Sequence, residues 1–141
     1  YTTTAGLPAL RDKIAKSWDN LCPGLDESNV CMTMSGTNAL LNIFASLVDP
    51  GKNVLLPEPY FPLYGPDVGL WGGEARFYEC LFDNEFVPEI EHLESLVDED
   101  TVAILYNFPS KLLSYLGLYY NLTISHPVFS NPIIKSAGRL Y

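Results

Sequence analysis

Hydrophobic residues along the first 107 positions follow two alternating periods. Apolar residues that recur every three or four positions predict helices, and compact apolar or β-branched runs predict buried strands. Strands that alternate with helices indicate an α/β fold with a mostly parallel sheet, joined by right-handed crossovers. Ligands of such sheets bind beyond the carboxyl ends of the strands. The predicted helices are 7–21, 36–48 and 88–97, and the predicted strands are 29–34, 53–56, 74–78 and 101–106.

Turn-forming residues separate these elements. Pro23-Gly24 ends the first helix, and Pro50-Gly51 follows the second. Pro57 and Pro59 come after the second strand, so we expect the backbone to leave the sheet after residue 56. The residues predicted to face the core are Leu10, Ile14 and Trp18 in the first helix, Leu40, Phe44 and Leu47 in the second, and Ile90, Leu93 and Val97 in the third.

Composition narrows the class of protein. Apolar residues make up 48% and charged residues 18%, which excludes a disordered or fibrous chain. The net charge of -9 argues against nucleic acid and anionic membrane as partners. No apolar stretch is long enough to predict a membrane span. Since no two of the three cysteines form a CxxC pair, we expect no metal site and reduced thiols in a cytoplasmic protein.

The two ends of the chain differ in charge. All 17 acidic residues lie at or before Asp100, whereas residues 111–141 contain none and carry a net charge of +3. Over the same residues the hydrophobic positions no longer follow a helix or strand period. We therefore expect a boundary after Ser110, followed by an unassigned tail of different origin; an ordinary C-terminal extension is the alternative. Because the chain begins with Tyr1, we also expect that its first residue is not the native start.

One turn combines the features of an anion-binding site. Residues 33–40 read as the end of a strand, a turn of Ser35, Gly36 and Thr37, and the start of a helix. Backbone N–H groups at a helix N-terminus, two hydroxyls and a glycine that permits close approach suit a phosphate. The alternative is that Ser35 and Thr37 only cap the helix.

A second segment carries aromatic residues at the end of a buried strand. Residues 49–64 (DPGKNVLLPEPYFPLY) place Tyr60, Phe61 and Tyr64 after two prolines. A rigidly held aromatic ring can stack on a planar cofactor. Packing in the hydrophobic core is the alternative for all three rings.

Four segments together resemble the class I/II aminotransferases, which use pyridoxal 5′-phosphate. Residues 1–11 (YTTTAGLPALR) are similar to the family pattern Y-x-x-x-x-G-x-x-x-L-R, and residues 35–37 to its phosphate-binding turn. Residues 50–64 resemble the pattern P-G-x-x-V-x-x-P-x-P-x-(aromatic), and residues 106–110 (YNFPS) the opening of N-x-P-x-N-P-T-G. Residues 1–110 are thus identified as part of the family's large domain, with an α/β fold and a mostly parallel sheet.

The resemblance implies a role for each matching residue. Ser35, Gly36 and Thr37 would hold the cofactor phosphate, and Phe61 would stack on its pyridine ring, with Tyr64 as second candidate. Tyr1 matches the tyrosine that reaches the neighbouring subunit's phosphate in the family. The resemblance thus implies a homodimer that moves amino groups between an amino acid and a 2-oxo acid.

The match fails at the residues that act on the substrate. Lys111 stands where the family has an asparagine that contacts cofactor and substrate. The family's aspartate facing the pyridine nitrogen, its cofactor-binding lysine and its substrate-binding arginine have no matching positions. No catalytic residue is therefore assigned, and we expect this chain alone to be inactive. Two alternatives stay open: a fragment of a carbon–sulfur lyase or related synthase, and a non-catalytic dimerisation partner.

Overall fold

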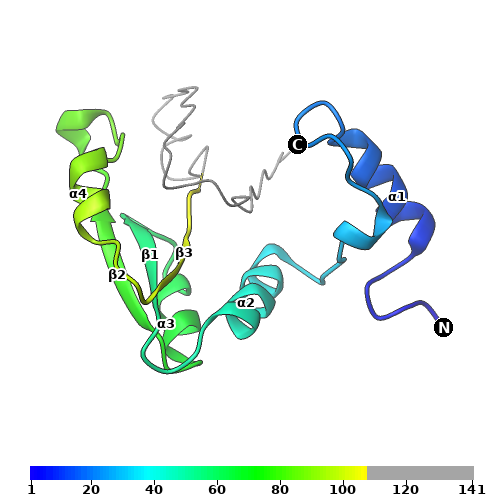
Figure 1. The fold of residues 1–141 in the computed structure, drawn as a ribbon, viewed down its shortest axis with the longest axis horizontal. Coiled ribbons are helices and arrows are strands. Elements are labelled where there is room, and N and C mark those ends of the chain that lie inside the picture. The colour runs from blue at the N-terminus through cyan, green and yellow to red at the C-terminus, as the bar shows by residue number, and fades with distance from the viewer. Residues whose placement is uncertain (108–141) are drawn as a thin grey trace. The chain divides into compact units, whose positions relative to one another are not determined.

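The computed structural model describes residues 1–107, which form two compact units. The first unit is Tyr1–Ser46 and the second begins at Leu47 (Figure 1). Predictions about residues 108–141, including the tail and Lys111, lie outside the described residues. None of the helices in residues 1–107 is long and apolar enough to cross a bilayer.

The first unit contains two α-helices and a short 3₁₀ turn. Helix α1 spans Pro8–Ser17, the 3₁₀ turn η1 spans Glu27–Asn29, and helix α2 spans Gly36–Leu47 and enters the second unit at its last residue. Pro8 occupies the first turn of α1, where a missing N–H costs nothing. Both helices were predicted, but α1 ends at Ser17 rather than at residue 21, and turns with hydrogen bonds back to Trp18 follow it.

The predicted inward faces of these two helices are only partly right. In α1 the buried residue is Ala15, whereas Leu10 is exposed. In α2 Phe44 is buried as predicted, and Leu47 is exposed. Periodicity located the helices but not the rotation of the buried face.

The predicted strand at residues 29–34 is wrong. Its first residue belongs to η1, Val30 is extended, and none of residues 30–34 belongs to a strand. Asn29 and Val30 donate within the turn that precedes them, and Met32 N donates to the distant Ala5 O at 2.9 Å. β-Branched composition favours an extended backbone, but a strand also needs a neighbour to pair with.

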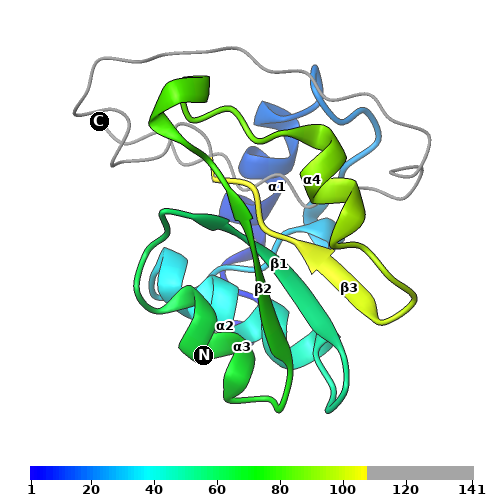
Figure 2. The ribbon, with the colours of Figure 1, turned by 90° about the vertical axis from the view of Figure 1, so that its left-hand side faces the viewer.

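The second unit is built on a parallel sheet of strands in the order β2-β1-β3 (Figure 2). The strands are β1 (Asn53–Glu58), β2 (Glu74–Glu79) and β3 (Thr101–Ile104). All three were predicted. Strand β3 is two residues shorter than expected, and β1 is two residues longer.

Pro57 lies inside β1, which corrects the expectation that the backbone leaves the sheet after residue 56. Successive residues of a strand direct their N–H and C=O groups to opposite neighbours. Leu55 O accepts from Leu105 N, so Leu55 and Pro57 face the β3 side. The β1–β3 register ends at Leu55 opposite Ile104. The missing N–H of Pro57 therefore falls beyond the paired part of β3 and breaks no ladder bond.

Two helices cover opposite faces of this sheet (Figure 1). Helix α3 (Tyr64–Gly69) buries Val68, and helix α4 (Ile90–Ser95) buries Leu93 against Leu55 and Tyr78. Helix α3 was not predicted, and α4 is shorter than the expected 88–97. In α4 the prediction for Leu93 is confirmed, whereas Ile90 is exposed.

A polar cluster ties β1 and β3 together at their amino ends. Asn53, only 1% exposed, donates from Nδ2 to Asp98 Oδ1 at 2.8 Å and accepts at Oδ1 from Thr101 Oγ1 at 2.8 Å. Arg76 of β2 donates from Nη1 to Asp98 Oδ2 at 2.6 Å. We call Asn53, Asp98, Thr101 and Arg76 the amino-end cluster. It satisfies the buried amide, which would otherwise destabilise the sheet.

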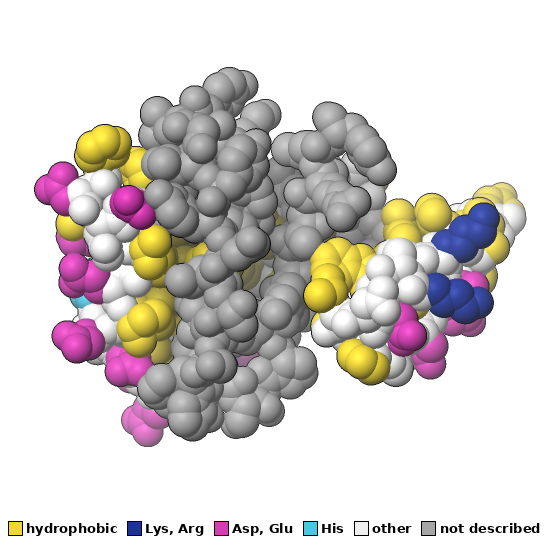
Figure 3. All heavy atoms as spheres, turned by 90° about the horizontal axis from the view of Figure 1, so that it is seen from above, with side chains coloured by type: hydrophobic (Ala, Val, Ile, Leu, Met, Phe, Trp, Pro, Cys, Tyr) yellow, Lys and Arg dark blue, Asp and Glu magenta, His cyan; other side chains and the backbone are white. Residues whose placement is uncertain are grey.

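Acidic residues concentrate in the second unit, and Figure 3 shows many of them on its visible face. They flank the apolar side chains of the same unit.

Candidate functional site

The predicted binding residues lie in both units, with Tyr1 and residues 35–37 in the first and Phe61 and Tyr64 in the second. In the first unit, Ser35 precedes α2 and caps it: its Oγ accepts from the Asn38 N–H at 3.1 Å. Its main-chain carbonyl accepts from Ala39 N and from Thr33 Oγ1, both at 2.9 Å. Ser35 therefore caps α2. The cap uses an acceptor position of the hydroxyl and leaves its proton available to a ligand.

The two residues after Ser35 present unused donors. Gly36 and Thr37 occupy the first turn of α2, where no helix carbonyl can accept from their N–H groups. No atom of residues 1–107 lies within 4 Å of the position that a Gly36 side chain would take. Ser35, Gly36 and Thr37 are all exposed. We call them the anion turn, because free amides, hydroxyls and open space match what an oxyanion needs.

In the second unit the aromatic segment follows the carboxyl end of β1. Tyr60 stacks on Phe77 of β2, with ring centroids 4.8 Å apart and an angle of 26° between the rings. Phe61 contacts Tyr64 at 5.6 Å in a tilted arrangement and is 49% exposed. Core packing is therefore wrong for Phe61, whose ring keeps an accessible surface for a planar partner.

Tyr64 begins α3 and is half-buried. Burial raises the pKa of its hydroxyl above the ordinary value for tyrosine. At neutral pH the hydroxyl is therefore protonated and can donate a hydrogen bond.

The carboxyl ends of β2 and β3 are joined by a hydrogen bond that the sequence did not indicate. Tyr78, 1% exposed, donates from its hydroxyl to the main-chain carbonyl of Leu105 at 2.8 Å. Burial raises the pKa of Tyr78 far above its ordinary range and that of the nearby Cys80 thiol to about 11. A buried tyrosine in a strand needs a partner for its hydroxyl, which was the available signal. The bond fixes the backbone that leads into Tyr106 and Asn107.

Tyr1 is fully exposed in the first unit. A turn follows it, closed by hydrogen bonds from Gly6 N to Thr3 O at 2.9 Å and from Thr3 Oγ1 to Gly6 O at 2.6 Å. Its ring is therefore carried on a short arm before an ordered turn.

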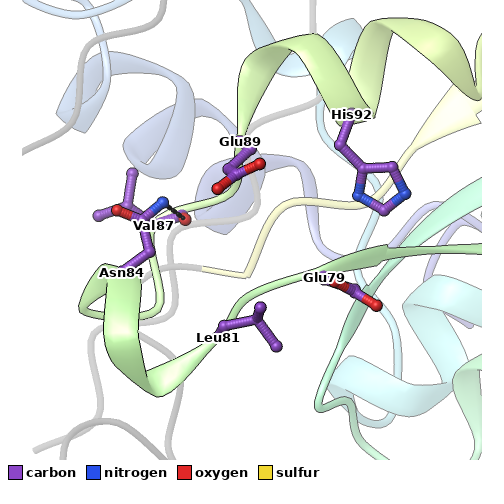
Figure 4. Close-up of a pocket in the computed structure, with 6 residues that line it drawn as sticks. All are labelled: Glu79, Leu81, Asn84, Val87, Glu89 and His92. Atoms are coloured by element: carbon purple, nitrogen blue, oxygen red, sulfur yellow. Dashed lines mark hydrogen bonds between the residues drawn. The ribbon is translucent and has the colours of Figure 1, made fainter.

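A small hollow lies at the carboxyl end of β2. Figure 4 shows Glu79, Asn84, Glu89 and His92 around it, with the His92 ring directed toward Glu79. Its water-accessible space of about 20 Å³ is enough for a single water molecule. Within residues 1–107 no group of three or more His, Cys, Asp or Glu side chains could hold a metal ion.

Comparison with known proteins decides the family. The model of the family described as aminotransferase class I and II matches residues 1–111. The chain belongs to this family. Aspartate aminotransferase of Geobacillus stearothermophilus is 35% identical over 112 residues, which cover 78% of this chain and 28% of the relative. Tyrosine aminotransferase of Bos taurus is 32% identical over 112 residues, covering 78% of this chain and 25% of the relative.

Solved structures agree in fold. The crystal structure of aspartate aminotransferase from Thermotoga maritima superimposes with a TM-score of 0.74 at 31% identity, covering 79% of this chain and 30% of that one. Alanine aminotransferase from Pyrococcus furiosus gives a TM-score of 0.73 at 29% identity, covering 86% and 30%. The class I and II aminotransferase assignment and the α/β fold predicted from the sequence are both confirmed. The chain spans about three tenths of the length of these relatives.

Proposed function

We propose that residues 1–110 form the cofactor-binding front of the large domain of a pyridoxal-phosphate-dependent aminotransferase. The intact protein would exchange amino groups between an amino acid and a 2-oxo acid. The observation that carries the proposal is the anion turn: a chain of this family presents two free amides and two exposed hydroxyls at the start of α2. The relatives named above are all aminotransferases, which favours amino-group transfer over carbon–sulfur bond cleavage.

The anion turn fits the phosphate of the cofactor. The amides of Gly36 and Thr37 would donate to phosphate oxygens, and the hydroxyls of Ser35 and Thr37 would add two donors. The open space at Gly36 lets the phosphate approach the backbone. When bound, pyridoxal phosphate supplies the electron sink for negative charge at the substrate Cα. These residues of the chain only bind and orient it.

The accessible face of Phe61 would stack on the pyridine ring, with the Tyr64 hydroxyl as a neighbouring donor. Tyr1, on its exposed arm, would contact the phosphate bound by a second copy of the chain. This role requires a homodimer of the intact protein. We place that protein in the cytoplasm.

A polypeptide of these 141 residues alone would not transaminate. Lys111, which the resemblance aligns with the family's asparagine, lies outside the described residues. The resemblance gives no residue of the chain the role of the cofactor-binding lysine, the aspartate at the pyridine nitrogen or the substrate-binding arginine. Without these groups nothing moves the proton at the substrate Cα. We propose that the family domain ends at Ser110 and that residues 111–141 are a separate tail.

Binding of pyridoxamine 5′-phosphate tests the proposal, because this ligand lacks the aldehyde that reacts with any lysine. The 141-residue chain should bind it more tightly than pyridoxamine, which has the same ring without phosphate. Thr37→Val removes one hydroxyl and should weaken pyridoxamine 5′-phosphate binding about tenfold, with little effect on pyridoxamine. Thr4→Val, the same change at an exposed residue of the N-terminal turn, is the control.

Equal dissociation constants for the two ligands would refute the phosphate site. Turnover of an amino acid with a 2-oxo acid by the 141-residue chain, in the presence of pyridoxal phosphate, would refute the proposed inactivity. A single assay of keto acid formation measures the second outcome.

A further inference from the structure

Arg11 on α1 makes two hydrogen bonds that link distant parts of the first unit. Its Nε donates to Val30 O at 2.7 Å and its Nη2 to Glu27 O at 2.5 Å. Both acceptors are main-chain carbonyls, so the guanidinium fixes backbone positions rather than pairing with a carboxylate. The planar fork of arginine suits two acceptors at once, and lysine cannot reproduce it.

The segment that Arg11 holds is itself rigid. η1 has a capping box in which Asp26 Oδ1 accepts from Ser28 N at 2.7 Å and Asn29 Oδ1 accepts from Asp26 N at 3.0 Å. A bond to Glu27 O therefore anchors a preformed turn rather than a loose loop.

A second set of contacts aligns residues 5–11 with residues 27–32, the segments that Arg11 also joins. Met32 N donates to Ala5 O at 2.9 Å, and Gly6 has φ of +100°. A side chain at Gly6 would place its Cβ 2.6 Å from the Met32 Cβ. Only glycine satisfies both the backbone angle and this close approach.

The anchored run leads directly into the anion turn. Only Thr33 and Met34 separate Met32 from Ser35, and Thr33 Oγ1 donates to Ser35 O at 2.9 Å. The backbone that presents the anion turn is thus fixed on one side by α2 and on the other by the contacts of Arg11 and Gly6.

We propose that Arg11 is a positioning residue for the anion turn. Through η1 and the extended run after it, Arg11 holds the amides of Gly36 and Thr37 where they bind phosphate. The contacts of Ala5 and Gly6 with Met32 also fix the position of the segment that carries Tyr1. This inference rests on the proposed function, since it concerns how that phosphate site is held.

The test compares three variants of the 141-residue chain. Arg11→Met removes both hydrogen bonds, Arg11→Lys keeps the charge without the fork, and Lys16→Met removes an exposed charge from the same helix. Among the described residues, Lys16 pairs only with Asp12 on the surface of α1, and such an exposed ion pair contributes little to stability. The measured quantity is the ratio of the dissociation constants for pyridoxamine and pyridoxamine 5′-phosphate, which isolates the phosphate contribution.

Arg11→Met should lower this ratio about tenfold, and Arg11→Lys should restore part of it, since each bond of the fork contributes. Lys16→Met should leave it unchanged. Hydrogen exchange at the Met32 amide should also be faster in Arg11→Met, in the same variant in which the ratio of dissociation constants falls. A general loss of folding would instead weaken the binding of both ligands equally. The ratio of the two dissociation constants would then stay unchanged. If Arg11→Met does not fold, Arg11→Lys against Lys16→Met carries the same comparison.

The positioning role would be overturned if Arg11→Met keeps the wild-type ratio of dissociation constants. If Arg11→Met does not fold, a wild-type ratio in Arg11→Lys has the same meaning. Either result would leave the proposed phosphate site in place. A wild-type chain without any preference for the phosphorylated ligand would overturn the proposed function and this inference together.

Discussion

Replacing Asn53 by alanine tests whether the amino-end cluster stabilises the second unit. The Asn53 side chain is 1% exposed and makes two hydrogen bonds, to Asp98 and from Thr101. Asn53→Ala removes both bonds and leaves the Thr101 hydroxyl with one partner fewer. Asp98 loses less, because Arg76 still donates to it and its side chain is 42% exposed to water.

The size of the effect follows from the number of bonds lost. Two hydrogen bonds of a buried amide, at about 1 kcal/mol each, predict a decrease of about 2 kcal/mol in the free energy of unfolding. Thr101→Val removes the hydroxyl from the shared 2.8 Å bond. In a double-mutant cycle the two changes should couple by about 1 kcal/mol, since that bond is counted in both single variants.

Urea unfolding at pH 7, followed by tryptophan fluorescence and circular dichroism, measures these free energies. The control is Asn42→Ala, the same change at an exposed position of α2, which should alter stability by less than about 0.5 kcal/mol. If the changes in the free energy of unfolding caused by Asn53→Ala and Thr101→Val simply add in the double variant, a stabilising hydrogen bond between the two side chains is refuted. A loss no larger than that of the control would refute the stabilising role of the whole cluster.

Two further predictions concern single hydroxyl and carboxyl groups. Tyr78→Phe should lower the free energy of unfolding by about 1 kcal/mol in urea, because the part-buried Leu105 carbonyl loses its donor, whereas Tyr60→Phe at an exposed ring should not. The hydrogen bond from Arg76 holds the pKa of Asp98 well below its usual range, so Asp98 stabilises the fold above about pH 4 and this contribution is lost as the pH falls further. Acid titration of unfolding should therefore be less steep below pH 4 in Asp98→Asn, and an unchanged slope would contradict the assignment.

The parts of the fold that the sequence predicted are those specified locally. Strand β1 is a continuous apolar run, and all of its residues except the last are buried. Helix α2 begins where Ser35 caps it, and both the cap and the apolar period lie within a few residues of each other. The anion turn was recognisable for the same reason, since its amides are free by virtue of their position in the helix.

The parts that were missed depend on partners far away in the chain. Residues 29–34 have strand-like composition, but in the described part of the chain no strand lies beside them. The backbone bond from Met32 to Ala5 ties them to a distant segment, whereas the bonds from Asn29 and Val30 only close the preceding turn. Arg11 reads as a polar residue of an ordinary helix until the carbonyls of Glu27 and Val30 are placed next to it. Helix α3 is short and contains two glycines and a proline, so its apolar pattern is too brief to detect.

The two ends of the sheet therefore have separable roles. The amino-end cluster acts at Asn53, while the aromatic segment begins after Glu58, and the six residues of β1 between these points extend about 17–20 Å. At the carboxyl end, Pro57 donates nothing to the β3 side and Tyr78 holds the backbone at Leu105. A change at Asn53 should consequently reduce stability without altering the accessible face of Phe61. A change at Tyr78 should affect both, because its hydrogen bond lies at the edge from which the binding segments leave the sheet.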